Sequence, residues 1–135
     1  MPSVTFDRTR EIDAVIVHIT GLGVDDSFDS TLRVPASDRF HIVLRHAPNF
    51  ALGDVQADLL VAGHTHGGQV RLPWIGPIFT FSTIPRSWAT GATRLSGGRW
   101  LVVSSGVGLE RGSAPRLRFL CRPEIAVIHV EPAAN

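Results

Sequence analysis

Three of the six histidines lie in two short segments that could hold a metal ion or an anion. His46 stands in an Arg-His-Ala-Pro segment, and His64 and His66 stand in a Gly-His-Thr-His-Gly-Gly segment. Each segment directly follows an apolar run, so we expect both to lie at one edge of a sheet if the two strands are parallel neighbours. Imidazole is a ligand for zinc, manganese, iron and nickel. The spacing therefore predicts a metal or anion site at that edge.

The remaining histidines and the other reactive residue types exclude several kinds of catalytic site. His18, His41 and His129 lie inside strand-like runs, where a histidine is more often packed than functional, so no role is assigned to them. The chain contains neither Lys nor Tyr, which excludes a Schiff-base lysine, a phosphate-loop lysine and a tyrosine acid or nucleophile. Cys121, the one cysteine, lies in an apolar run and is expected to be a buried, inert thiol.

The elements that must position these histidines are short. Apolar, β-branched runs predict strands over 12–19, 41–44 and 58–62, with a short helix over 50–56 that Asn49 caps. The run 58–62 is almost wholly apolar, which predicts a strand buried on both faces. Further strands are predicted over 92–95 and 100–104, joined as a hairpin, and over 117–121 and 125–130. So few helices over a buried strand would leave one face of a sheet unprotected, so a layer is expected to be missing.

The composition limits the number of domains, the class of partner and the location that can be expected. The chain has 135 residues, of which 44% are hydrophobic and 19% charged, so one globular domain is expected. Thirteen basic residues against twelve acidic ones give a net charge of +1, which argues against nucleic acid as a partner. No run reaches the ~18 apolar residues that a membrane-spanning helix needs. We expect a soluble chain, cytoplasmic by default, whose parent protein could be membrane-associated.

The runs around the histidines resemble those of a known family. Residues 42–48 (Ile-Val-Leu-Arg-His-Ala-Pro) and 59–73, with Gly-His-Thr-His-Gly-Gly-Gln at their centre, are similar to the C-terminal motifs of calcineurin-like metallophosphoesterases. The likeness continues through residues 21–26, 104–108 and 118–125, so it covers most of the chain. Within that family the sequence resembles the bacterial branch that hydrolyses phosphodiesters or, like UDP-diacylglucosamine pyrophosphatases, nucleotide-lipid pyrophosphates.

The resemblance implies a fold, a reaction and a set of site residues. The fold would be α+β, the β-rich part of an αββα sandwich whose strand ends hold two metal ions. His46 and His64 would bind one ion and His66 the other, while Gly67 and Gly68 would leave room for a phosphate. The ions would be Mn, Fe, Zn or Ni, and a metal-activated water would hydrolyse a phosphodiester or pyrophosphate. The substrate would be a small phosphoester or a lipid-linked one.

The family's earlier motifs are absent from this sequence. It has no Asp-x-His, no Gly-Asp-x-x-Asp and no Gly-Asn-His followed by an acid, so no bridging carboxylate is identified. Residues 1–135 are therefore expected to be a single partial domain that lacks the N-terminal strands. Because three neutral ligands cannot offset the repulsion of two divalent ions, at most one weakly bound ion is expected. Unrecognised carboxylates such as Asp25, Asp26 or Asp54 would have to complete the site.

Two functions remain in competition. The first is a metal-dependent phosphoesterase, completed by a missing N-terminal half. The second is a non-catalytic binding domain that retains a single metal or phosphate site. If strands are missing, those that end at His46 and His64 should present unpaired edges and exposed apolar surface, which would favour self-association.

Four side chains near the histidine loop could bear on a ligand. Trp74 and Trp88 flank the Gly- and Pro-rich stretch that follows His66, and we expect them to pack in the core or its rim rather than to line a pocket. Arg116 and Arg118 alternate along the chain, which predicts a solvent-facing row rather than a phosphate contact.

Overall fold

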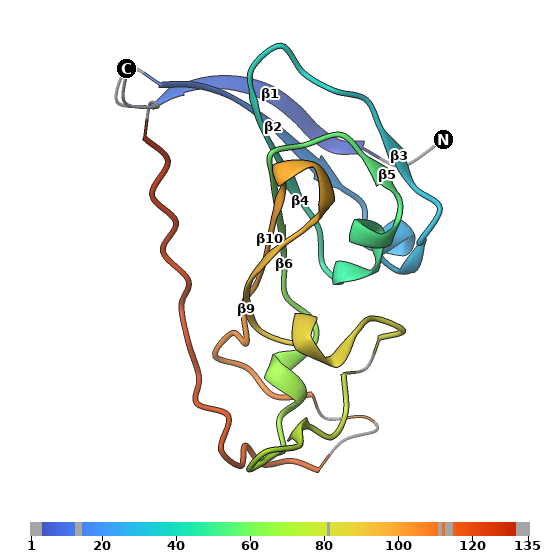
Figure 1. The fold of residues 1–135 in the computed structure, drawn as a ribbon, viewed down its shortest axis with the longest axis vertical. Helices are drawn as coiled ribbons and strands as arrows, with labels where there is room; N and C mark the ends of the chain where they lie inside the picture. Colours follow the sequence, from blue (N-terminus) through green and yellow to red (C-terminus); the bar gives the residue numbers. More distant parts are fainter. Residues whose placement is uncertain (1–3, 13–14, 81, 111, 113–114, 132–135) are drawn as a thin grey trace.

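The computed structural model describes residues 4–12, 15–80, 82–110, 112 and 115–131, and its main element is one mixed sheet (Figure 1). Within those residues the sheet has six strands in the order β1-β2-β4-β6-β10-β9. The four inner strands, β2, β4, β6 and β10, are parallel to one another, and the edge strands β1 and β9 are antiparallel to β2 and β10. Their bounds are Val4–Ile12 (β1), Val15–Leu22 (β2), Phe40–Leu44 (β4), Leu59–Ala62 (β6), Gly91–Arg94 (β9) and Trp100–Val103 (β10).

The remaining elements are very short. Two two-stranded ladders pair β3 (Arg33–Val34) with β5 (Asp54–Val55) and β7 (Arg71–Leu72) with β8 (Gly76–Pro77). The helical turns are all of the 3-10 type: η1 (Asp25–Phe28), η2 (Pro48–Leu52), η3 (His66–Gly68), η4 (Arg86–Trp88) and η5 (Ser96–Gly98). A mixed, sheet-rich fold without long helices is thus confirmed for the described part of the chain. None of its helices has the length and apolar character needed to cross a membrane.

The strands that lead to the histidines lie inside the sheet. β4 pairs with β2 and β6, and β6 pairs with β4 and β10, so neither strand has a free edge. The prediction of unpaired edges at these two strands was therefore wrong. The physical reason is that two antiparallel hairpins, β1–β2 and β9–β10, close the sheet on either side. Of these, β1 was not predicted, because its sequence lacks the apolar alternation that marks a half-buried strand.

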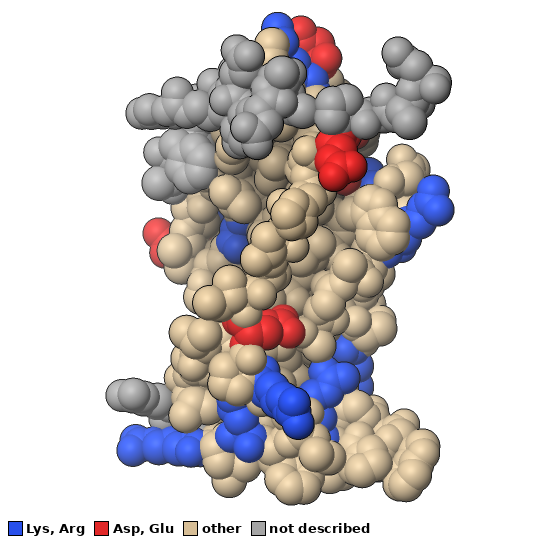
Figure 2. Space-filling model, turned by 90° about the vertical axis from the view of Figure 1, so that its left-hand side faces the viewer, with Lys and Arg blue, Asp and Glu red and all other residues tan. Residues whose placement is uncertain are grey.

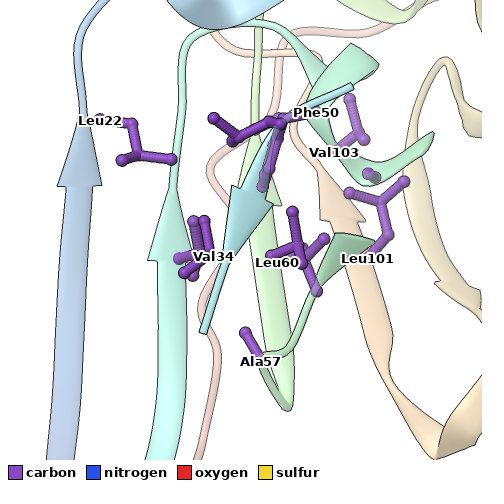
Figure 3. Packing of buried hydrophobic residues seen from close by; sticks show 12 residues of the cluster. Leu22, Val34, Phe50, Ala57, Leu60, Leu101 and Val103 are labelled. Atoms are coloured by element: carbon purple, nitrogen blue, oxygen red, sulfur yellow. The ribbon is translucent and has the colours of Figure 1, made fainter. Parts of the chain in front are cut away.

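The core lies on one face of the sheet. Val43, Leu60 and Leu101 from the three central strands are at most 1% exposed, and they pack towards Phe50 of η2, which is fully buried (Figure 3). Burying a side chain such as Phe50 stabilises the fold by about 1.5–3 kcal/mol. Leu59, on the other face of β6, is only 6% exposed. The prediction that this strand is buried on both faces is thus confirmed for Leu59, whereas Val61 on the same face is only half-buried.

The C-terminal part differs from the sequence prediction. Residues 121–131 run beside the sheet in an extended form without joining it (Figure 1). Within residues 117–121, the strand pairing consists of a single β-bridge between Phe119 and Val70. Strands over 117–121 and 125–130 were therefore wrongly predicted. The left-handed backbone of Leu120, with φ 50°, interrupts the first, and Ile125, which is 82% exposed, has no sheet neighbour.

The predicted helix over 50–56 is also shorter than expected. The 3-10 turn η2 ends at Leu52, because Gly53, its C-cap, has an extended backbone that leads directly into β5 at Asp54. Asn49 does not cap it: the N-cap is Ala47, and the Asn49 side-chain amide donates to Thr83 Oγ1 at 3.0 Å. Pro48 at the first position of the turn, where no hydrogen bond is lost, begins it instead.

Candidate metal centre

His46 and His64 lie side by side at the carboxyl edge of the sheet. Each stands two residues beyond its strand, and the backbone ladder continues to them, since the Gly63 N–H donates to the His46 carbonyl at 3.0 Å. Nδ1 of His64 and Nε2 of His46 are 2.9 Å apart, and the ring centres are 4.7 Å apart. The predicted meeting of these two histidines at one sheet edge is confirmed.

The backbone around His64 is bent sharply and held in place. His64 has φ 67°, in the left-handed region that a residue with a side chain seldom adopts. The neighbouring Thr65 is fully buried, and its hydroxyl donates to the Ala89 carbonyl at 2.6 Å. Phe28 of η1 packs edge-on against the His64 ring at 5.0 Å between centres. These contacts fix the direction of the His64 ring towards His46.

His66 begins η3 and also has a left-handed backbone, with φ 48°. Its carbonyl oxygen accepts hydrogen bonds from Cys121 Sγ at 3.2 Å and from Arg118 Nη1 at 3.4 Å. The three histidines do not form a ligand cluster. Among the described residues, no group of three or more His, Cys, Asp or Glu side chains is arranged to hold a metal ion.

The electrostatics of the site favour neutral imidazoles. Burial, followed by the charge of His64, lowers the pKa of His46. Burial is also the largest cause for His66, whose pKa is lowered further by the Arg118 guanidinium and raised in part by Glu110. Metal ions bind the neutral ring, so less proton competition is expected at neutral pH than for an ordinary histidine.

Arg45, the neighbour of His46, occupies an unusual place for a cation. Its side chain is fully buried, its Nη2 lies 3.6 Å from Asp26 Oδ2, and its Cζ lies 5.7 Å from the centre of the Phe50 ring. Its side-chain nitrogens make no hydrogen bond to any described residue, and burial lowers the pKa of Arg45 to about 10. It stays charged at neutral pH, so Asp26 serves as its counter-ion.

The carboxylates named as candidates do not complete a metal site. Asp26 faces Arg45, and Asp54 accepts a hydrogen bond from Gln56 Nε2 at 2.5 Å. Asp25 is exposed on η1. The donor set of the described chain therefore fits part of a metal site: two imidazoles converge, and no carboxylate joins them in a cluster of three ligands.

The two glycines after His66 are required by packing. A Cβ on Gly67 would lie 2.6 Å from both Cys121 Sγ and Ser105 Oγ. One on Gly68 would collide with Pro77 and with the Phe79 carbonyl. Both glycines also have positive φ values, of 62° and 81°. Close approach of the backbone thus accounts for both, and their contact with a phosphate stays a prediction.

Arg118 has a structural role that sequence reasoning missed. Its guanidinium donates to the carbonyls of Ser105, Gly106 and Gly108 at 2.6–2.9 Å, so it is not part of a solvent-facing row. The predicted solvent face was therefore wrong for Arg118. No signal in the sequence marks this contact, because the acceptors are main-chain carbonyls of a turn ten or more residues away. Arg111 lies outside the described residues.

Two other expectations are confirmed. Cys121 is buried, at 6% exposure. His41 is a satisfied core histidine, with Nε2 2.9 Å from Thr20 Oγ1 and its ring stacked on His18 at 4.4 Å.

Similar proteins carry metallophosphoesterase names. The chain is 38% identical over 102 residues to the uncharacterized metallophosphoesterase YkuE of Bacillus subtilis (strain 168), which covers 74% of this chain and 34% of that protein. It is 33% identical over 91 residues to the phosphodiesterase YaeI of Escherichia coli (strain K12), which covers 66% of this chain and 32% of that protein. An uncharacterized metallophosphoesterase of Aquifex aeolicus (strain VF5) is 29% identical to the chain over 98 residues, which are 72% of this chain and 35% of that protein.

The chain thus spans about a third of the length of these curated relatives. No family model matches the chain, and no solved structure matches it significantly.

Proposed function

The chain belongs to the calcineurin-like metallophosphoesterase family, and from that premise we propose that it contributes imidazole ligands to the metal centre of a phosphoester hydrolase. His46 and His64 would bind one divalent ion, and His66 would bind the second. The observation that carries the proposal is the 2.9 Å contact between His46 Nε2 and His64 Nδ1 at the carboxyl edge of the sheet. Residues 1–135 would form a single partial domain of such an enzyme.

The chain's own residues would position the ligands. Thr65 anchors the loop through the Ala89 carbonyl, and Phe28 limits rotation of the His64 ring. The lowered pKa of His46 keeps its ring neutral, which is the form that binds a metal. A divalent ion, when bound, lowers the pKa of a coordinated water and neutralises charge on phosphoryl oxygens. Because the described chain offers no carboxylate cluster, we propose that the missing ligands come from residues outside this sequence.

The substrate would be a phosphodiester or a pyrophosphate. The name phosphodiesterase belongs to the relative from Escherichia coli, and it supports this class for the present chain without identifying the compound. A lipid-linked phosphoester is a narrower proposal within the same class. Gly67 and Gly68 would lie next to the phosphate, because they adjoin His66.

A non-catalytic binding domain is the second candidate. It is favoured by the absence of a third ligand beside His46 and His64 among the described residues. Such a domain would bind one metal ion or one phosphate and would not turn over substrate.

Hydrolysis of bis-p-nitrophenyl phosphate with added manganese separates the two candidates when it is measured on a protein that joins this sequence to the residues proposed to supply the missing ligands. A catalytic site predicts turnover that falls at least ~100-fold in His64→Ala and in His46→Ala. The matched control is His129→Ala, which removes an exposed histidine of the C-terminal segment and should leave the rate unchanged. Turnover that survives His64→Ala would contradict the proposal. Metal binding without turnover would support the binding domain.

A further inference from the structure

The β7–β8 hairpin holds Trp74 out into solvent. The hairpin pairs Arg71 with Pro77 and Leu72 with Gly76, which leaves a three-residue turn whose centre is Trp74. The Trp74 side chain is fully exposed, at 102%, and its backbone is left-handed, with φ 63°. The expectation that it packs in the core or rim was therefore wrong, whereas Trp88 does pack against the core. A large aromatic side chain that is fully exposed, on a left-handed backbone, indicates a surface that binds another molecule.

The neighbours of Trp74 form one apolar and basic surface. A hollow of about 600 Å³ is lined by Trp74 together with Leu72, Ile75, Leu120, Arg71 and Arg86. We call these six residues the Trp74 surface. Ile75 and Leu120 are 60% and 61% exposed, so the apolar part is contiguous and open.

The charge of this part of the chain has one sign. The sequence contains no Asp or Glu between Asp58 and Glu110, a stretch that includes Arg71 and Arg86. Neither of these two arginine side chains forms a hydrogen bond or ion pair with the described residues, whereas the nearby Glu124 is held by Ser105 N–H and the Thr90 hydroxyl. On the face shown in Figure 2, blue side chains gather towards the lower end of the molecule, where the hairpin lies in Figure 1.

The hairpin is fastened to the histidine loop. Arg71 N–H donates to the Phe119 carbonyl at 2.9 Å, and Phe119 N–H donates to the Gln69 carbonyl at 2.8 Å. Gln69 is fully buried and stands three residues after His66. The hairpin is therefore a rigid projection from the end of the sheet that carries the histidines.

We propose that the Trp74 surface docks the protein onto an anionic lipid bilayer. Trp is the side chain that best occupies the boundary between headgroups and acyl chains, and exposed Leu and Ile can bury beside it. Arginines that line the same hollow and are not held in ion pairs attract anionic headgroups. A protein partner would also bury the apolar residues, but Arg71 and Arg86 form no ion pair with the described residues, and the one acidic side chain bonded to a residue of the hollow, Glu124, is held by Thr90 and Ser105, which favours a surface of uniform negative charge. The inference does not require catalysis and does not rest on the proposed hydrolase function.

Vesicle co-sedimentation of the 135-residue chain tests the proposal. The chain should bind vesicles of phosphatidylcholine mixed with phosphatidylglycerol, bind pure phosphatidylcholine far less, and lose binding as salt is raised. Trp74→Ala should weaken binding about tenfold, and Arg71→Ala and Arg86→Ala about fivefold each. The matched controls, Ile125→Ala and Arg33→Ala, remove an exposed apolar and an exposed basic residue elsewhere and should bind as wild type.

Two further readouts keep the outcome unambiguous. Because Trp74 touches little, Trp74→Ala should melt at the wild-type temperature, so weaker binding cannot come from unfolding. His64→Ala should bind vesicles as wild type does, which separates this test from that of the hydrolase proposal. The proposal is overturned if Trp74→Ala binds as wild type, if neutral vesicles bind equally well, or if the chain sediments without vesicles through a Trp74-dependent association between copies.

Discussion

Replacing Gly67 with alanine tests whether the histidine loop is held by close packing. Two costs follow from the geometry. The left-handed backbone at φ 62° disfavours any side chain by about 1–2 kcal/mol. The new Cβ would also lie 2.6 Å from Cys121 Sγ and Ser105 Oγ, which adds an overpacking cost of about 1–3 kcal/mol. We therefore expect Gly67→Ala to lower the free energy of unfolding by about 2–5 kcal/mol.

Gly106→Ala is the matched control. Gly106 has nearly the same backbone angle, φ 60°, yet a Cβ there would meet nothing within 4 Å. It should lose only the backbone part, about 1–2 kcal/mol. Urea denaturation of both variants and the wild type, fitted with a common slope, measures the difference. Equal losses in the two variants would refute the packing account of Gly67 and would leave a role in ligand binding as the better explanation for this glycine.

Three other predictions follow from single side chains. Arg45→Met should lower the free energy of unfolding by about 1 kcal/mol or more in urea denaturation, because it removes the counter-ion that lies 3.6 Å from the partly buried Asp26 carboxylate. Higher stability of the variant would mean that the buried guanidinium, which lacks hydrogen bonds, costs more than the pair contributes. Gln69→Ala should cost about 1–3 kcal/mol in the same assay, because the Glu110 N–H loses its acceptor and the Pro115 carbonyl loses one of its two donors. The exposed control Gln56→Ala should cost far less. The Thr31 hydroxyl and N–H lower the pKa of Asp29, so its contribution to stability is present above pH ~3.8 and is lost as the pH falls through the lower folded pKa. Thermal melts from neutral to acid pH should accordingly show a smaller acid loss for Asp29→Asn, and identical profiles would refute this assignment.

The pairing of His46 and His64 could be predicted from the sequence. Each follows an apolar run at the same short distance, and parallel neighbours bring such positions to one edge. The place of His66 could not be predicted. It depends on a left-handed backbone and on hydrogen bonds to its carbonyl from Cys121 and Arg118, which lie more than fifty residues away in the sequence.

The central strands could be predicted, but the ends of the sheet could not. Buried strands such as β6 have a strong apolar signal, whereas β1 owes its place to pairing with β2. The apolar run over 125–130 wrongly predicted a strand, because such a run reports a suitable surface and not the presence of a pairing partner. The exposure of Trp74 could not be predicted either. A large apolar side chain is expected to pack, and its exposure here depends on the geometry of the turn between β7 and β8.

Metal titration of the purified chain tests the central claim most directly. Isothermal titration with zinc or manganese at neutral pH should show one weak site, which both His46→Ala and His64→Ala abolish and which His129→Ala leaves intact. Acidification should weaken binding, because protons compete for the two imidazoles. Binding that persists unchanged in His64→Ala would contradict the claim that the two histidines at the sheet edge form a metal site.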